Sequence, residues 1–414
     1  MPTKELLLFE LERGENEIEK DDIQHIIKYM GSKKPILDFI ISAIHEVHLD
    51  GHPVCDLFAG SCSISAALRT KYDFFSNDIQ AYSQILASLY FSNLTAYSYK
   101  EIISRIDPLV TSHVQWFRDH YAELFVNYAN SITLEEYQKI ESRQRELYET
   151  GVFDPNHDHL FTKYYSGTYW SFEQCVWIDA LRKAADSFKG EQTFYAIMAS
   201  IMYGMSYTTQ STGHFAQYRD GDTQKAMLNI LTYRRKNFYL LFKRKLKALM
   251  DNLLVPVKTL TTSTLSYEDC LATVIPEGTT VYADPPYAPV HYSRFYHALE
   301  TLVKYDYPPI EHKGRYRTDR HQSPFSQKTN ALEAFGKLYA GVIEKKSQLI
   351  LSYSDSGVAG IEEIKQLAEA KFDAADYEVS VRTLDHKHST MGRFEDHERD
   401  VLECLIIAKL KSRN

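Results

Sequence analysis

The sequence has few cysteines, and their spacing carries no pattern. No Cys-x-x-Cys pair is present, so the usual spacing of a zinc site is missing, and the cysteines do not suggest a disulfide framework. Basic residues are fewer than acidic ones, with 47 Lys and Arg against 55 Asp and Glu and a formal net charge of -8 at pH 7. Nonspecific polyanion binders usually carry a basic excess, so any contact with nucleic acid has to come from a local basic patch. The cysteines are Cys55, Cys62, Cys175, Cys270 and Cys404.

Long apolar runs are absent as well. Residues 1–22 are too acidic, and their apolar run Leu6–Phe9 is too short, for a signal peptide or a membrane span. With 414 residues and 44% hydrophobic content, the chain can form two or three domains with packed cores. Together with the scattered cysteines, these features predict a soluble protein of a reducing cytoplasm.

One short stretch organises the rest of the chain. An apolar segment at residues 279–283 predicts a strand, and it ends at Asp284-Pro285-Pro286-Tyr287. A strand cannot continue through two prolines, so the chain turns there. The turn leaves a carboxylate, a proline carbonyl and an aromatic face together, at the strand end where α/β sheets bind ligands.

This grouping suits a planar base that carries an exocyclic amine. The N6 amine of adenine is a poor nucleophile because its lone pair is delocalised into the ring, and positive charge develops on it as it attacks. The Asp284 carboxylate and the Pro285 carbonyl can accept its hydrogens and stabilise that charge, while Tyr287 stacks on the ring. Such a site requires neither a covalent intermediate nor a metal. Without a cofactor site nearby, a loop that merely ends a strand explains the motif equally well.

Two earlier strand ends supply features of a cofactor site. A short apolar run leads into Asp56, Phe58 and Gly60, and small residues then begin a helix, as in nucleotide-binding units. The full Gly-x-Gly-x-x-Gly pattern is missing, which weakens a dinucleotide interpretation. A second predicted strand, residues 74–78, ends in an acid, Asp78, roughly twenty residues after the glycine turn, where such folds bind ribose hydroxyls.

Another glycine turn precedes these units. Tyr29, Gly31, Ser32 and Lys33 come just before apolar residues at helical spacing over 36–44. Ser32 can cap that helix, and backbone N–H groups together with the lysine can hold a carboxylate. Helix capping with a solvated lysine is the alternative.

Between residues 96 and 255 the composition changes to aromatic and mixed-charge stretches, which predicts a helical insertion in the sheet. Its glycine-punctuated polar loops can reach base edges and stack on bases. Basic residues follow at 233–247 as a candidate phosphate-contacting face, with a solvated helix face as the equal alternative. The candidate nucleic-acid contacts are Gln210, Ser211, His214, Tyr218, Arg234, Arg235 and Lys236.

The sheet is expected to resume after this insertion. Asp269, in an acidic turn, can accept a hydrogen bond from the amino group of a cofactor adenine. The long polar and aromatic segment over 291–317 is predicted to be a mobile cover over the site. Strands are predicted at 256–260, 279–283, 348–353 and 400–408.

Taken in order, these motifs resemble those of the Dam-type DNA adenine N6-methyltransferases, the alpha group of the D12 class. In that family a lysine-containing glycine turn comes first, then the S-adenosylmethionine turn, an inserted target-recognition region and last the catalytic Asp-Pro-Pro-Tyr. The resemblance implies a Rossmann-like α/β methyltransferase sheet from residues 1–95 and 256–414, around a mainly helical target-recognition insertion over 96–255. One departure is Cys62, where relatives commonly have glycine.

The resemblance also implies roles for single residues. Asp284–Tyr287 would hold a flipped adenine of double-stranded DNA for direct in-line transfer of a methyl group from S-adenosylmethionine. Asp78 would hold the cofactor ribose, and Asp269 the cofactor adenine. The methionine part of the cofactor would contact Tyr29, Gly31, Ser32, Lys33, Asp56, Phe58 and Gly60.

Three alternatives stay open. The same acceptors suit cytosine N4 or an adenine in RNA. A DNA-binding subunit can keep the fold without activity, and a nicotinamide oxidoreductase shares the strand-glycine-helix unit.

The sequence does not determine which DNA sequence is recognised, which role the protein has in the genome, or whether a separately encoded restriction endonuclease is its partner. The expected setting is a monomer in a bacterial or phage-infected cytoplasm, in restriction-modification or host marking.

Overall fold

The structure is built on one mixed sheet. The computed structural model of the chain describes residues 26–29, 33, 36–210, 214–389 and 398–411. In this part, seven strands pair in the order β3-β2-β1-β4-β7-β9-β8; the first five are parallel, and β9 runs antiparallel to both its neighbours. The strands are β1 (Val54–Asp56), β2 (Phe74–Asn77), β3 (Leu260–Ser263), β4 (Thr280–Ala283), β7 (Gln348–Ser354), β8 (Tyr377–Ser389) and β9 (Glu398–Leu410).

The strand order reverses between β1 and β4. From β1 the chain proceeds outward to β2 and β3 on one side, and it returns to place β4 and β7 on the other. Such a topological switch point is where open α/β sheets bind ligands. The predicted α/β sheet is confirmed, and the strand ends that carry Asp56, Asp78 and Asp284 converge at this edge.

Two details of the strand prediction are wrong. Residues 256–260 were expected to form a strand, but β3 begins only at Leu260, and the N–H of Lys258 donates to the carbonyl of Arg69 instead. Strand β8 is not among the predicted strands at all. Its residues Glu378 and Ser380 are exposed, as is common for the edge strand of a sheet, so no continuous apolar run marks it.

Helices cover both faces of the sheet, and strand residues alternate between them. Val54 and Phe74 face one layer, whereas Cys55 and Val281 face the other. The predicted helix over 36–44 is confirmed as α2. The first layer contains α2 (Leu37–Val47), α3 (Ser63–Leu68) and α4 (Ala81–Tyr90), and the second contains α12 (Tyr267–Thr273), α14 (Ala331–Glu344) and α15 (Ile361–Asp373).

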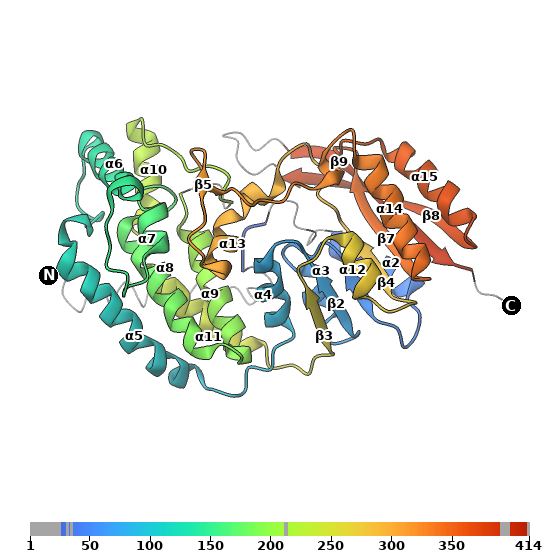
Figure 1. The fold of residues 1–414 in the computed structure, drawn as a ribbon, viewed down its shortest axis with the longest axis horizontal. Coiled ribbons are helices and arrows are strands. Elements are labelled where there is room, and N and C mark those ends of the chain that lie inside the picture. Colours follow the sequence, from blue (N-terminus) through green and yellow to red (C-terminus); the bar gives the residue numbers. More distant parts are fainter. Residues whose placement is uncertain (1–25, 30–32, 34–35, 211–213, 390–397, 412–414) are drawn as a thin grey trace.

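The described residues between 96 and 255 form a helical lobe at one end of the molecule, at the left of Figure 1. Three of its helices begin with a capping box, in which Ser98, Thr133 or Ser171 accepts a hydrogen bond from the backbone N–H three residues further on. Local sequence thus defines where these helices begin. The lobe contains α5 (Tyr99–His120), η2 (Ala122–Leu124), α6 (Leu134–Thr150), α7 (Leu160–Tyr165), α8 (Phe172–Ala185), η3 (Asp186–Phe188), α9 (Gln192–Thr208), α10 (Gln224–Arg234) and α11 (Phe238–Asn252).

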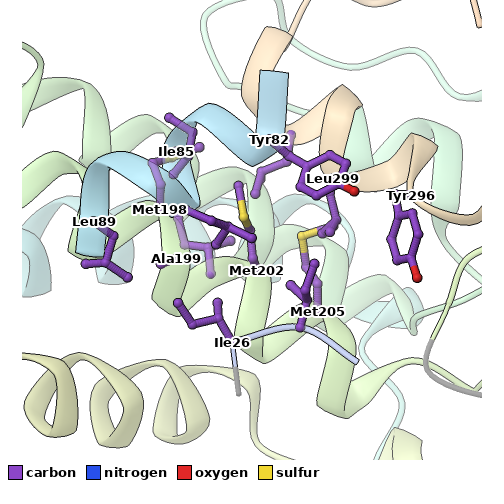
Figure 2. Packing of buried hydrophobic residues seen from close by; sticks show 14 of the residues in the cluster. Ile26, Tyr82, Ile85, Leu89, Met198, Ala199, Met202, Met205, Tyr296 and Leu299 are labelled. Carbon is purple, nitrogen blue, oxygen red and sulfur yellow. The ribbon is translucent and has the colours of Figure 1, made fainter. Parts of the chain in front are cut away.

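The lobe and one face of the sheet share an apolar core. Figure 2 shows Met198, Met202 and Met205 of α9 in the same cluster as Ile85 of α4 and Leu299 of α13 (His297–Lys304). All five side chains are buried. Because close-packed interiors resist deformation, this packing sets the position of the lobe against the sheet.

The segment that follows β4 connects the lobe and the sheet. The guanidinium of Arg315 donates to the backbone carbonyls of Tyr164 and Arg145, both in the lobe. The Tyr316 hydroxyl donates to the carbonyl of Ala216. The mobility predicted for this segment stays a prediction. Its elements are η4 (Tyr292–Phe295), α13, β5 (Ile310–Glu311), β6 (Tyr316–Arg317) and η5 (Pro324–Ser326).

Candidate active site

A cavity of about 370 Å³ lies at the switch point, where β1, β2 and β4 end. It unites residues that are far apart in the sequence, because the ends of parallel strands meet at one edge of a sheet. Gly31, Ser32 and Ser211 lie outside the described residues. The predicted site residues that line the cavity are Tyr29, Lys33, Asp56, Phe58, Gly60, Asp78, Asp284, Pro285, Pro286 and Tyr287.

Two carboxylates lie at the ends of neighbouring strands. Asp56 is 2% exposed, and its Oδ1 has no hydrogen-bond partner among the described residues. Burial, and after it the charges of Asp284 and Asp78, raise the pKa of Asp56 well above its ordinary value. Asp78 accepts hydrogen bonds from the backbone N–H groups of Gln80 at 2.9 Å and Gly60 at 2.8 Å, and burial raises its pKa to about 6. A buried acceptor without a donor fits a ligand that donates a hydrogen bond there.

The turn between β1 and α3 brings the backbone close to Tyr29. Gly60 has a φ of +51°, and a Cβ at this position would lie 2.3 Å from the Tyr29 hydroxyl oxygen. Cys62 also has a positive φ, 60°, and its sulfur lies 3.3 Å from the carbonyl oxygen of Ser83. The cysteine therefore retains a left-handed conformation that a glycine adopts more easily.

An aromatic cleft forms another wall of the cavity. Phe58, Tyr267 and Phe325 meet with ring centroids 5.0 to 5.9 Å apart, and all three line the cavity. The Asn77 side chain supports this wall, since its Nδ2 donates to the carbonyl of Leu265 at 3.1 Å. Flat aromatic walls suit a planar heterocycle. Of these rings, only Phe58 was predicted to be a site residue. Tyr267 belongs to the acidic turn in which Asp269 was chosen instead, and nothing in the local sequence of Phe325 marks it as a site residue.

The structure corrects the role predicted for Asp269. This residue is exposed in the first turn of α12, where its N–H and its carboxylate both bond to the Ser266 hydroxyl, at 3.0 and 2.7 Å. Tyr267 and Glu268 line the cavity instead. Each residue of a helix is rotated by about 100° from the one before it, so Asp269 faces away. Its carboxylate holds the Ser266 hydroxyl that caps α12, and it does not line the cavity.

The turn after β4 contains a buried ionic cluster. The Nζ of Lys33 lies 3.1 Å from Oδ1 of Asp284, 3.5 Å from Oε2 of Glu403 and 5.9 Å from the ring centroid of Tyr287. Burial raises the pKa of Asp284 to about 6, with Lys33 lowering it and Glu403 raising it. Burial lowers the pKa of Lys33, but Asp284 and the other acidic groups around it raise that pKa well above its ordinary value. The lysine is therefore charged at neutral pH.

The basic face predicted in the lobe is not continuous. Arg234 ends α10 with its side chain 0% exposed, and its guanidinium donates to Oε2 of Glu141 at 2.6 Å and to the carbonyl of Thr168 at 3.1 Å. Gln210 is also buried, and its amide donates to the carbonyl of Arg219 at 3.1 Å. These two side chains stabilise the interior of the lobe, which corrects the prediction that they contact nucleic acid.

The other described candidates lie nearer the surface of the lobe. Arg235 is exposed, and its Nε donates to the carbonyl of Tyr128 at 2.8 Å. Lys236 is half-buried, with Nζ 2.7 Å from the carbonyl of Tyr207. Burial lowers the pKa of the half-buried His214 to about 4, so its ring is neutral at pH 7. Tyr218 is the exception, because it is only 9% exposed and belongs to the buried apolar core.

The charges around the cavity fit a cationic nucleoside. A nucleoside presents a planar base to the aromatic cleft and ribose hydroxyls to a carboxylate, and S-adenosylmethionine adds a sulfonium and an ammonium that suit the acidic groups. The fold and the cavity together define a Rossmann-like methyltransferase domain. The charged residues that line the cavity are Lys33, Asp56, Asp78, Glu268 and Asp284, an acidic excess.

Comparison with known proteins gives the family. The family model described as D12 class N6 adenine-specific DNA methyltransferase matches residues 29–173 and 178–352. The chain belongs to this family, which confirms the resemblance at the level of the D12 class.

Three curated relatives are modification enzymes. Modification methylase LlaI of Lactococcus lactis subsp. lactis is 23% identical over 392 residues, 92% of this chain and 54% of that protein. Type II methyltransferase M.FokI of Planomicrobium okeanokoites is 25% identical over 364 residues, 83% of this chain and 47% of that protein. Modification methylase StsI of Streptococcus sanguinis is 21% identical, covering 82% of this chain and 46% of that protein. The chain spans about half the length of these relatives.

Within the described ranges, no helix is both long enough and apolar enough to cross a membrane. The same residues contain no group of three or more His, Cys, Asp or Glu side chains arranged to hold a metal ion.

Replacing Phe325 with Ala is expected to weaken binding of S-adenosylmethionine. The change removes one ring of the aromatic cleft, and stacking of a base on an aromatic ring contributes about 1–3 kcal/mol, so the Kd from calorimetry should rise about tenfold or more. Phe372→Ala is the control, because Phe372 is equally buried in the same core cluster but does not line the cavity. A Kd for Phe325→Ala equal to that of the control would show that this ring does not contact the cofactor.

Proposed function

We propose that this protein is a site-specific DNA methyltransferase that transfers a methyl group from S-adenosylmethionine to the exocyclic N6 amine of an adenine in double-stranded DNA. Family membership and the modification enzymes among its relatives support this reaction. The observation that carries the proposal is the position of Asp284, which directly follows β4 and lines the same cavity as Asp56 and Asp78. One cavity thus combines acceptors for a substrate amine with acceptors for a cofactor.

The residues of the first two strand ends fit the cofactor. Each oxygen of Asp78 accepts one backbone hydrogen bond and keeps lone pairs for the ribose hydroxyls. The Oδ1 of Asp56, which no described residue hydrogen-bonds, suits a donor of the methionine part. Phe58, expected from the sequence beneath the methionine part, is proposed here to enclose the adenine together with Phe325. When bound, the cofactor supplies a methyl group on an electrophilic sulfonium. The remaining proposed contacts with the methionine part are Tyr29, Gly31, Ser32, Lys33 and Gly60.

The turn after β4 is proposed to hold the target base. Taking an adenine out of the duplex costs a few kcal/mol, which stacking on Tyr287 and contacts at the base edge offset. The carboxylate of Asp284 and the carbonyl of Pro285 accept the two N6 hydrogens, and Pro286 fixes the turn that directs them. Positive charge develops on N6 as it forms its new bond, and the buried carboxylate stabilises that charge. The chain therefore contributes alignment and charge stabilisation.

The helical lobe is proposed to recognise the DNA target. In this proposal residues 96–255 are the target-recognition region, and residues 1–95 and 256–414 form the two parts of the catalytic domain. The exposed Arg235 and the adjacent Lys236 provide the positive charge that a phosphate contact needs. The other proposed contacts are Ser211, His214 and Tyr218.

The cellular setting is also a proposal. The motif order supports the finer placement in the Dam-type alpha group. The relatives' names support a restriction-modification context, with a separately encoded endonuclease of the same specificity as a partner. We place the protein, as a monomer on its duplex, in a bacterial cytoplasm.

The test is methylation of plasmid DNA from a methylation-free host with labelled S-adenosylmethionine, followed by base-resolved detection of the modified positions. Modified adenine in one short sequence context is the expected result, and it identifies the specificity at the same time. Label on cytosine, or only on added RNA, would contradict the proposed substrate. Absence of any label in the presence of bound cofactor would contradict the proposed reaction for this chain.

A further inference from the structure

Glu403 reaches the candidate active site from the last strand of the sheet. It lies in β9, pairs in register with Ser354 at the end of β7, and is 1% exposed. Strand β7 separates β9 from β4, so this side chain extends along the edge of the sheet to Lys33, which is 370 residues away in the sequence. A carboxylate buried to this degree needs a charged partner. Lys33 is the partner that the described residues provide.

Lys33 is shared between two carboxylates. Its Nζ lies 3.1 Å from Oδ1 of Asp284 and 3.5 Å from Oε2 of Glu403. When all three groups are ionised, the cluster keeps one excess negative charge. An ammonium paired with Asp284 alone would neutralise the carboxylate that has to stabilise positive charge on the substrate amine. Sharing the ammonium with Glu403 keeps Asp284 in a charge-assisted hydrogen bond and preserves that negative charge.

We propose that Glu403 is a positioning residue for methyl transfer, which holds Lys33 so that the ammonium orients Asp284 without neutralising it. Glu403 acts through Lys33, and Asp284 and Tyr287 face the substrate. Its role in turnover rests on the proposed function, whereas its effect on the ionisation of Asp284 can be measured without any turnover.

The two charged neighbours of Asp284 act on its pKa with opposite sign. Glu403 raises that pKa and Lys33 lowers it. Glu403→Gln is therefore expected to lower the pKa of Asp284 from about 6, and Lys33→Met to raise it. Turnover should fall at low pH because Asp284 becomes protonated. The pH at which it falls should be lower in Glu403→Gln and higher in Lys33→Met than in the parent. The titratable groups around Asp284 are Lys33, Glu403, Asp56, Tyr282, Tyr287 and Tyr292.

A residue that only balances the charge of Lys33 would behave differently. Loss of Glu403 would then lower stability and the affinities for cofactor and DNA together with turnover. In the positioning role, kcat falls while KM for DNA and the cofactor Kd change little, and the pH profile moves. The kcat of Glu403→Gln is expected to fall about tenfold, the effect of roughly one charge-assisted hydrogen bond.

The experiment compares the parent, Glu403→Gln, Lys33→Met and a control, Glu378→Gln. Glu378 is an exposed carboxylate of the neighbouring strand β8, and its loss is expected to change nothing. Turnover is measured from about pH 5 to 8. The ionisation of Asp284 is followed separately by ¹³C NMR of protein labelled at the aspartate carboxyl carbon. The signal is assigned by its loss in Asp284→Asn.

The two readouts separate the outcomes. A shifted Asp284 titration together with a kcat-specific loss supports the proposal. An unmoved titration in Glu403→Gln overturns it, whatever happens to turnover. If the parent methylates DNA and Glu403→Gln has the same kcat as the parent, the positioning role is overturned and the proposed function stays intact. If the Asp284 titration shifts in Glu403→Gln but the parent does not methylate DNA, the proposed function is overturned, and with it the role of Glu403 in turnover. The shift would still support the charge arrangement.

Discussion

Asp284→Ala is expected to lose nearly all methyl transfer and to keep its affinity for S-adenosylmethionine. The change removes the acceptor for N6 and the negative charge next to it, and loss of a charge-stabilising group of this kind costs about 3 kcal/mol, or roughly 10²–10³ in kcat. Of the contacts proposed for the cofactor, Lys33 is paired with Asp284, but those of Asp56, Asp78 and the aromatic cleft are left in place by the substitution. Calorimetry with the cofactor and single-turnover methylation of a DNA duplex measure the two effects separately.

Two further variants sharpen this result. Asp284→Asn keeps the shape and one acceptor oxygen but removes the charge, so its kcat should lie close to that of the Ala variant. Asp373→Ala is the control, because Asp373 is an exposed carboxylate in the last turn of α15, paired only at the surface with Lys411. Turnover of Asp284→Ala within about threefold of the parent would exclude charge stabilisation by this residue.

Arg234→Met is expected to destabilise the protein by about 3–5 kcal/mol, because it leaves the buried carboxylate of Glu141 without its main partner. The side chains of Arg234 and Glu141 are 0% and 2% exposed, and two hydrogen bonds join them, at 2.6 and 3.2 Å. The remaining partners of Glu141 are weaker: the Tyr128 hydroxyl lies 3.4 Å away, and the Arg145 guanidinium lies 3.9 Å from Oε2 and also bonds to the Gly167 carbonyl and to Asp220. The free energy of unfolding from urea denaturation measures the loss.

The neighbouring arginine provides the matched control. Arg235 is exposed, so Arg235→Met should change the free energy of unfolding by less than about 1 kcal/mol. The double variant Glu141→Leu with Arg234→Met removes both charges and should recover a large part of the lost stability. If Arg234→Met were as stable as the control and instead weakened DNA binding alone, the interior position of this side chain would be contradicted.

The comparison of these arginines shows where sequence reasoning was limited. A basic run such as residues 233–247 carries no information on which side chain turns inward. Arg234 does so because Glu141, 93 residues earlier, supplies a buried carboxylate. The same limit applies to Asp269, where the helical rotation of α12 placed the neighbouring residues in the cavity wall.

The central architecture, in contrast, was predictable. Buried parallel strands appear in the sequence as short apolar runs, and their ends necessarily share an edge, so Asp56, Asp78 and Asp284 could be grouped before their distances were known. Phe325 and Glu403 could not be grouped with them. Their neighbours in sequence resemble an ordinary loop and an ordinary strand, and only the folded structure brings Phe325 to the cavity and Glu403 to Lys33.

The place of β9 in the sheet has a consequence for synthesis of the chain. All seven residues of β7 are buried, and among the described strands one of its two edges is covered only by β9, which leaves the ribosome later than the other strands described. A nascent chain that ends before β9 therefore exposes an apolar, unpaired strand edge, which is a template for aggregation. It also lacks Glu403, so the ionic cluster of the site is complete only when translation has passed β9. Assembly of the sheet and assembly of the site thus finish in the same step.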